Sequence, residues 1–200
     1  MLFRSDDTID QTLNLVLFCR QVKIPFEVYG FNDVHGYAKM MNYKTNEIVL
    51  NDSFRLLNLL SSRMTLQEFN TGFINIIALR NSYDYRGSRD KDRPHARTPY
   101  SFGLNGTPLN EAIIVARKLV TNFRQKNKLQ IVNAIFLTDG ASGPNYLHGT
   151  RAYLTNCVIR DPLTKMTYKS ENSYHDCTTS LLRSLRDYTN ANVIGFYLAS

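Results

Sequence analysis

Long apolar runs are missing from this 200-residue sequence. Even the longest runs, such as residues 15–19, are far shorter than the ~20 residues that a membrane-spanning helix needs. Near the start of the sequence, Asp6 and Asp7 occupy the region where a signal peptide would have an apolar stretch. These absences predict a cytoplasmic protein that does not work at a membrane.

Cysteines and the common catalytic motifs are also scarce. Cys19, Cys157 and Cys177 are far apart, whereas disulfide frameworks and zinc sites use more cysteines or short paired spacings. We interpret them as thiols in a reducing compartment. The sequence contains no Gly-rich phosphate loop, no dinucleotide fingerprint and no Gly-x-Ser-x-Gly nucleophile elbow. It therefore predicts no nucleotide site and no catalytic activity of its own.

Positive charge is abundant, with a formal net charge of +7. Part of the excess lies in residues 80–97, where six Arg and Lys side chains outnumber three Asp side chains. Tyr83, Tyr85 and Tyr100 are interleaved with this stretch or follow it, as in basic segments that contact nucleic acid. A solvated loop, or a docking loop for an acidic protein, is the alternative for the same residues.

Helical and strand patterns alternate along the chain. Apolar spacing predicts helices over residues 8–22, 53–61, 65–80, 107–128 and 174–188. It predicts strands over residues 26–31, 47–50, 131–137 and 192–198, and a hairpin made of residues 153–159 and 165–169. This order favours one α/β domain over residues 1–200, with a Rossmann-like, mostly parallel sheet flanked by helices.

Three local features of these elements can be predicted as well. Thr65 and Glu68 have the spacing of a capping box that opens a helix. The helix over residues 8–22 has apolar residues on more than one side, so we expect it to be covered on most sides. The almost continuous apolar run of residues 131–137 is typical of a central parallel strand covered on both faces.

Two polar positions fall where such a fold binds ligands. Asp139 follows the strand over residues 131–137, and Thr107 precedes the helix that Pro108 opens. Ligands of open α/β sheets bind beyond the carboxyl ends of the strands, so we predict the working surface at this edge. A purely structural interpretation remains open, in which Thr107 is a helix N-cap and Asp139 turns the chain with Gly140.

The same positions lie in segments that resemble a known family. Residues 104–112, Leu-Asn-Gly-Thr-Pro-Leu-Asn-Glu-Ala, and residues 136–140, Phe-Leu-Thr-Asp-Gly, resemble the von Willebrand factor A (VWA) domain. Residues 24–31 add to the likeness, which covers most of the chain and is closest to cobaltochelatase-subunit-like VWA proteins, including those of large tailed phages. The resemblance implies a metal-ion-dependent adhesion site, with Thr107 and Asp139 as ligands of Mg²⁺ or Mn²⁺.

The resemblance also implies partners. In this family the bound cation bridges to a carboxylate of another protein, so we expect a metal-dependent protein-interaction module. A chelatase-like VWA protein works beside a ring-forming AAA+ ATPase, as a non-catalytic part of the complex. A phage-encoded version would act in the host cytoplasm. The alternative function is nucleic-acid binding through the basic loop of residues 80–97.

One feature of the family is missing from the sequence. It has no Asp-x-Ser-x-Ser motif, which in the family follows the first strand and supplies further metal ligands. No strand pattern precedes the helix over residues 8–22, and no helix follows the last strand. We therefore expect a VWA-like fragment that is truncated at both ends and lacks its first strand. We also expect metal binding by this chain to be weak or absent.

Overall fold

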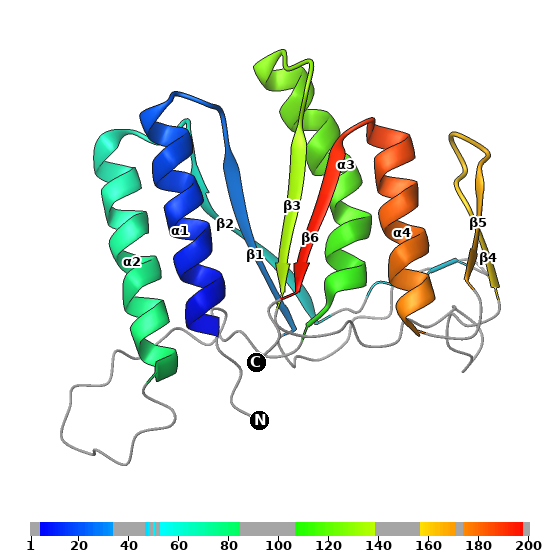
Figure 1. Cartoon of the computed structure of the whole chain (residues 1–200), viewed down its shortest axis with the longest axis horizontal. Helices are drawn as coiled ribbons and strands as arrows, with labels where there is room; N and C mark the ends of the chain where they lie inside the picture. The colour runs from blue at the N-terminus through cyan, green and yellow to red at the C-terminus, as the bar shows by residue number, and fades with distance from the viewer. Residues whose placement is uncertain are drawn as a thin grey trace.

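The computed structural model describes residues 5–33, 47–48, 50, 53–84, 107–138, 157–170 and 174–197. Helices and strands alternate along these residues, which confirms a mixed α/β protein (Figure 1). The elements, in chain order, are α1 (Ser5–Gln21), β1 (Glu27–Asp33), β2 (Phe54–Ser61), α2 (Leu66–Asp84), α3 (Leu109–Asn127), β3 (Asn133–Thr138), β4 (Cys157–Arg160), β5 (Thr167–Ser170), α4 (Tyr174–Thr189) and β6 (Asn192–Tyr197).

The described strands pair two by two. β1 is antiparallel to β2, β3 is parallel to β6, and β4 is antiparallel to β5. The β4–β5 pair confirms the predicted hairpin. Only one of these three pairings is parallel, so the described residues do not form the mostly parallel sheet that the sequence predicts.

β2 corrects the helix that the sequence predicts over residues 53–61. Leucine favours helices, and the leucine-rich pattern of this segment fits a helix as well as a strand. In the structure the segment pairs with β1 along its length, from Glu27 opposite Ser61 to Asp33 opposite Phe54. Leu60 is completely buried there. Strand pairing and burial therefore outweigh the local helix preference.

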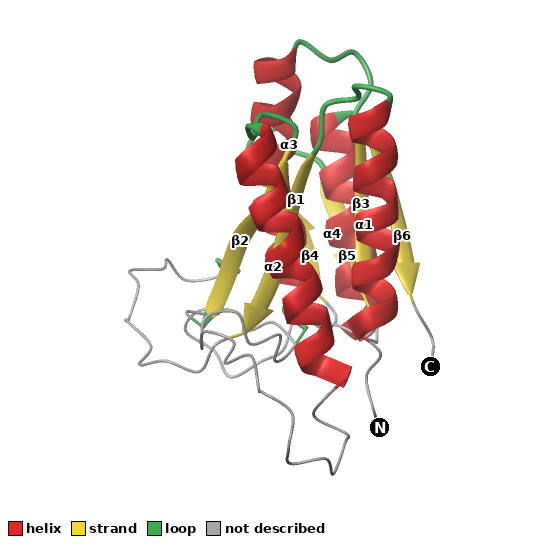
Figure 2. Ribbon diagram, turned by 90° about the vertical axis from the view of Figure 1, so that its left-hand side faces the viewer, coloured by secondary structure: helices red, strands yellow, loops and turns green. Residues whose placement is uncertain are grey.

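The helices cover the two larger strand pairs from different sides. Figures 1 and 2 show α1 and α2 beside the β1–β2 pair, while α3 and α4 lie beside the β3–β6 pair. One core cluster belongs to the first group and contains Ile9, Leu13, Val16, Phe26, Leu60, Phe69 and Ile76. A second belongs to α3 and α4 and contains Leu109, Ile113, Ala116, Cys177, Leu181 and Leu185. Phe31 of β1 and Phe136 of β3 both pack against this second cluster, which joins the two groups.

The capping box at the start of α2 is confirmed. The backbone N–H of Thr65 donates to Oε2 of Glu68 at 2.8 Å, and the backbone N–H of Glu68 donates to Oγ1 of Thr65 at 3.3 Å. These two bonds satisfy N–H groups that have no partner inside the helix. The helix they open extends to Asp84, slightly beyond the predicted end.

α1 is less covered than its sequence predicts. Val16 is 2% exposed, but Leu17 and Phe18 are 47% and 56% exposed. The prediction that the helix is covered on most sides is therefore wrong, because its packing partners lie along one side only. Within the described residues, no helix combines the length and the apolar character that crossing a membrane would require.

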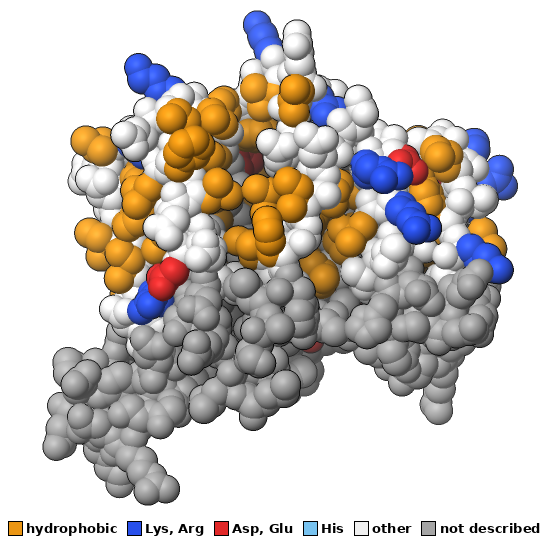
Figure 3. Space-filling model, viewed as in Figure 1, with side chains coloured by type: hydrophobic (Ala, Val, Ile, Leu, Met, Phe, Trp, Pro, Cys, Tyr) orange, Lys and Arg blue, Asp and Glu red, His pale blue; other side chains and the backbone are white. Residues whose placement is uncertain are grey.

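β3 is likewise covered on one face instead of two. Phe136 packs against α3 and α4, while its neighbour Ile135 is 38% exposed. The register of the parallel pair puts Ile135 beside Ile194 of β6, and Phe196 of β6 is 51% exposed. Figure 3 shows hydrophobic side chains on this side of the molecule. The predicted burial of both faces is therefore wrong.

Candidate functional site

Three strands end at the same end of the molecule. The carboxyl ends of β1, β3 and β6 point to the lower end of Figure 1, where α3 begins. β1 ends at Asp33 and β3 ends at Thr138. The parallel pairing of β3 and β6 brings Thr138 opposite Tyr197. The described elements thus form the edge at which the sequence predicts a ligand site.

Thr107 lies at this edge and is half-buried. It does not cap α3, because the N-cap residue is Pro108 and no side-chain hydrogen bond caps this helix in the described residues. The carbonyl oxygen of Thr107 instead accepts the backbone N–H of Leu109 at 2.8 Å. The structural interpretation of Thr107 as a helix N-cap is therefore wrong.

Asp139 lies outside the described residues. Its predecessor in the sequence, Thr138, is the last residue of β3. A contact between these two side chains stays a prediction.

The basic segment of residues 80–97 is also described only at its start. Arg80 belongs to α2, and its Nε and Nη2 donate to the two carboxylate oxygens of Asp10 at 2.6 and 2.7 Å. Residues 85–97 lie outside the described part. Arg80 therefore helps to hold α2 against α1. Binding of nucleic acid or of an acidic protein by the remaining basic side chains of the segment stays a prediction.

The first turn of α3 contains two buried polar residues that sequence reasoning missed. Asn110 is 1% exposed and Glu111 is 7% exposed. The hydroxyl of Thr178 on α4 donates to Oδ1 of Asn110 at 2.7 Å. Their position immediately after the Gly-Thr-Pro-Leu motif is the signal that could have identified them. They make the beginning of α3 polar as well as buried.

The end of β1 contains a second missed feature. Asn32 is completely buried. Within the described structure, Oδ1 of Asp33 is buried and has no hydrogen-bond partner. A buried carboxylate oxygen without a partner costs on the order of 1–3 kcal/mol, and a cation would offset that cost. The same rule that identified Asp139, a polar residue directly after a strand, would have identified Asp33.

The residue types at this edge fit a hard divalent cation. The hydroxyl of Thr107 and the carboxylate of Asp33 are oxygen donors, which Mg²⁺ and Mn²⁺ prefer over nitrogen or sulfur donors. Asp139, the residue after β3 in the sequence, is predicted to add a further carboxylate. The set is incomplete by itself: the described residues include no group of three or more His, Cys, Asp and Glu side chains that could hold a metal ion. Water and a partner's oxygen atoms would have to fill the remaining positions.

Two surface hollows lie at the other end of β1. One is lined by Asn58, Ser61, Arg63, Met64 and Glu68. The other is lined by Arg20, Lys23, Ile24, Pro25, Phe26, Ser62 and Met64. Both are open depressions beside the turn after β2, and a salt bridge between Arg63 and Glu27 lies next to them. Neither hollow includes a residue of the candidate edge.

No protein-family model matches this chain, and neither the curated proteins nor the solved structures include one with significant similarity to it.

Proposed function

We propose that this chain is a metal-dependent protein-interaction module of the VWA type, related to the chelatase-like members of that family. A divalent cation, Mg²⁺ or Mn²⁺, binds near Thr107 and Asp139, and a carboxylate of the partner completes its coordination. The main support is the placement of Thr107, the end of β3 and the buried Oδ1 of Asp33 at one end of the fold.

The chemistry of the edge supports this proposal. Mg²⁺ takes near-octahedral oxygen coordination and usually keeps several waters. Few protein ligands therefore suffice for weak binding, and a partner carboxylate that replaces a water adds affinity. The start of α3 adds to the attraction, because N–H groups at a helix N-terminus favour negative charge such as that of the partner carboxylate.

The partner follows from the resemblance to chelatase-like VWA proteins. It is a protein that presents a carboxylate, and a ring-forming AAA+ ATPase is our first candidate. In such a complex this chain binds and positions the partner and performs no chemical step itself.

Binding of Mn²⁺ alone tests the metal site. We expect the electron paramagnetic resonance signal of free Mn²⁺ to decrease on addition of the protein, and excess Mg²⁺ to restore it. Asp139→Asn should weaken binding at least about tenfold, because it removes a charged ligand. The matched control is Asp187→Asn near the end of α4, which also removes one carboxylate but should bind Mn²⁺ like the original protein.

Two results would contradict the proposal. One is the absence of any Mn²⁺ binding up to millimolar concentration, and the other is equal binding by the two variants. The alternative, nucleic-acid binding through residues 80–97, makes a different prediction. Binding of a DNA or RNA oligonucleotide would weaken steeply with salt and would not respond to a chelator.

A further inference from the structure

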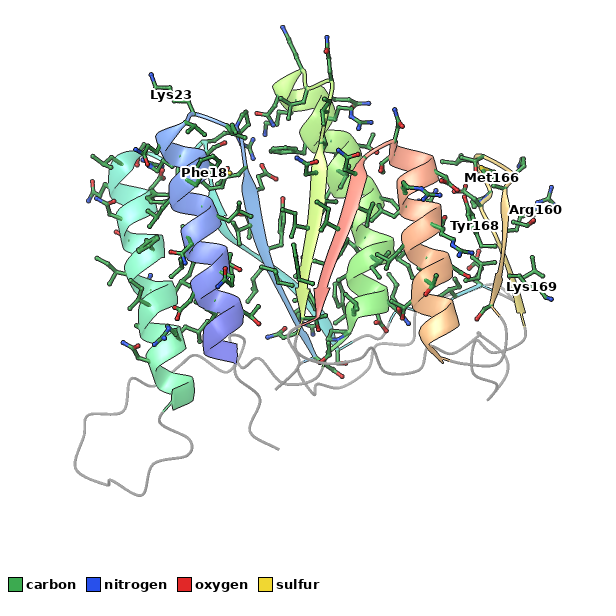
Figure 4. The ribbon with its side chains drawn as sticks, viewed as in Figure 1. Phe18, Lys23, Arg160, Met166, Tyr168 and Lys169 are labelled. Atoms are coloured by element: carbon green, nitrogen blue, oxygen red, sulfur yellow. The ribbon has the colours of Figure 1, made fainter. Side chains whose placement is uncertain are left out.

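An open hollow of about 430 Å³ lies where α1 ends and β1 begins. We name it the α1–β1 hollow, and it is lined by Arg20, Lys23, Ile24, Pro25, Phe26, Ser62 and Met64. Its volume is within the range of small-ligand sites, roughly 300–1,000 Å³. Figure 4 shows Lys23 on the turn that follows α1, at the end of the molecule opposite the candidate metal edge. The hollow is therefore separate from the site proposed above.

The two turns that form the hollow are tied together. The backbone N–H of Ser62 donates to the carbonyl oxygen of Phe26 at 2.9 Å, which joins the turn after β2 to the residue before β1. Phe26 is 9% exposed, and its ring meets the ring of Phe69 edge to face, with 6.4 Å between the ring centres. Met64 packs against the same core cluster. Because the fold already fixes these walls, little binding energy is lost in ordering them around a ligand.

The turn after α1 holds Lys23 in a defined backbone conformation. The backbone N–H of Lys23 donates to the carbonyl oxygen of Arg20 at 3.3 Å, and that of Ile24 donates to the carbonyl oxygen of Cys19 at 2.8 Å. This pair of bonds is typical of a helix that ends in a left-handed residue, and Lys23 has a φ of 59°. Glycine is the usual residue there, because it has no Cβ. The lysine contributes its side chain to the wall of the hollow instead.

Arg20 and Lys23 make the α1–β1 hollow positive. Neither forms an ion pair with another residue of the described part of the chain, and no Asp or Glu lines the hollow. The guanidinium of Arg20 lies 3.9 Å from the centre of the Phe69 ring. A guanidinium stacked on a ring keeps the N–H groups at its edge available to an anion. The nearby carboxylate of Glu27 is already paired with Arg63.

Apolar side chains make up most of the remaining lining. Ile24 is 48% exposed, and Pro25, Phe26 and Met64 lie beside it in the wall. An inorganic anion would leave these side chains in water, whereas a ligand with an aliphatic chain would cover them, which is favourable. A protein partner would need a contact surface of about 20–30 residues, while seven residues line this hollow. The size and the lining therefore favour a small molecule that carries both a negative charge and an apolar group.

We propose that the α1–β1 hollow binds a small organic anion, a carboxylate attached to an aliphatic chain. The guanidinium of Arg20 and the ammonium of Lys23 bind the carboxylate, and the chain lies over Ile24, Phe26 and Met64. Binding requires no metal ion, so this site is independent of the proposed function.

Titration of the full chain with hexanoate, followed by nuclear magnetic resonance, tests the proposal. We expect saturable shifts of the signals of Ile24 and Met64 that a chelator does not change. Two matched probes separate the contributions: hexanamide has the same size without the charge, and acetate has the charge without the chain. Each should bind at least about tenfold more weakly than hexanoate, because it keeps only one of the two interactions.

Variants of the two cationic residues locate the charge. Lys23→Glu should weaken hexanoate binding about tenfold, because it replaces attraction with repulsion. Arg20→Met keeps an apolar stem and should weaken binding by about as much, because it removes charge-assisted hydrogen bonds. The matched control is Lys128→Glu: Lys128 ends α3 in the same left-handed conformation, with a φ of 54°, but does not line the hollow. This control should alter binding less than about twofold.

Circular dichroism of each variant shows whether it keeps the fold. Equal weakening by Lys128→Glu and Lys23→Glu would overturn the proposal in favour of non-specific attraction to the net charge. Equal binding of hexanamide and hexanoate would overturn it as well, since the hollow would then not select an anion. Shifts confined to Ile135 and Ile194 would assign binding to the open face of the β3–β6 pair instead. The absence of saturable shifts up to about 10 mM hexanoate would also contradict the proposal.

Discussion

The two faces of the β3–β6 pair contain similarly apolar residues but have different surroundings. Phe136 and Val193 pack against the cluster that α3 and α4 form. Ile135 and Ile194, their direct neighbours in sequence, are both 38% exposed. The difference between the faces arises from the helices, since α3 and α4 cover one face and leave the other largely open. Apolar composition in a strand therefore indicates that burial is possible, whereas the neighbouring elements determine which face is buried.

The largest expected effect belongs to the covered side. Leu185 of α4 is completely buried in the cluster that supports Phe136 and Val193. Leu185→Ala should lower the free energy of unfolding by about 2–5 kcal/mol, because it removes buried methyl groups and leaves a cavity. Urea unfolding measures the effect. The control is Leu17→Ala, at a leucine of α1 that is 47% exposed. If Leu17→Ala lowered the free energy of unfolding as much as Leu185→Ala, the contrast between covered and exposed positions would be wrong.

An intermediate effect is expected for Asp161, whose side chain is 0% exposed. Burial by itself would raise the pKa of this carboxyl, but the N–H groups of Leu163 and Thr164 and the charge of Arg117 outweigh it and lower the pKa. A lowered pKa means that Asp161 stabilises the fold above about pH 4, and that this contribution disappears as the pH falls through the native pKa.

Asp161→Asn should therefore lower the free energy of unfolding by about 1–3 kcal/mol at neutral pH. The loss should be smaller in acid, because protonation there removes the same charge from Asp161 in the original protein. Urea unfolding at about pH 6 and about pH 3 measures both values. An equal cost at the two pH values would show that the charge of Asp161 does not stabilise the turn.

The smallest effect is expected on the open face and gives the sharpest comparison. Val193 and Ile194 are adjacent in β6, and their side chains point to opposite faces of the pair. Val193→Thr puts a hydroxyl against the apolar cluster and should therefore lower the free energy of unfolding by about 1–2 kcal/mol. Ile194→Thr should change the stability by no more than about 0.5 kcal/mol. Thermal unfolding of both variants measures the difference, and a larger cost at Ile194 would mean that the open face is covered in solution.

Local signals in the sequence were sufficient for several elements. The capping box of Thr65 and Glu68 depends on residues three positions apart, and the hairpin depends on the turn at Asp161-Pro162. Both were predicted because all the interacting groups are close in sequence. α3 was predicted for the same reason, since its apolar spacing and the preceding Pro108 are local features.

Features that depend on distant contacts could not be predicted in the same way. The leucine-rich segment of β2 becomes a strand because β1 is available as a partner, and no residue within the segment encodes that partner. The exposure of Ile135 depends on which helix lies over it.

The candidate edge was predicted in part. The rule for strand ends identified Asp139, and the start of the helix at Pro108 identified Thr107. The rule for strand ends was not applied to Asp33, whose buried oxygen is evident only in three dimensions.

The most direct test of the account is to locate bound Mn²⁺ by nuclear magnetic resonance, because paramagnetic Mn²⁺ broadens the signals of nearby amide groups. We predict that the amide signals of Thr107 and Thr138 broaden first, at low Mn²⁺ concentration. Excess Mg²⁺ should restore them, and Asp139→Asn should abolish the effect. Selective broadening elsewhere, such as at Arg63 and Glu68 beside the surface hollow, or uniform broadening without a preferred region, would contradict a metal site at the carboxyl ends of the strands.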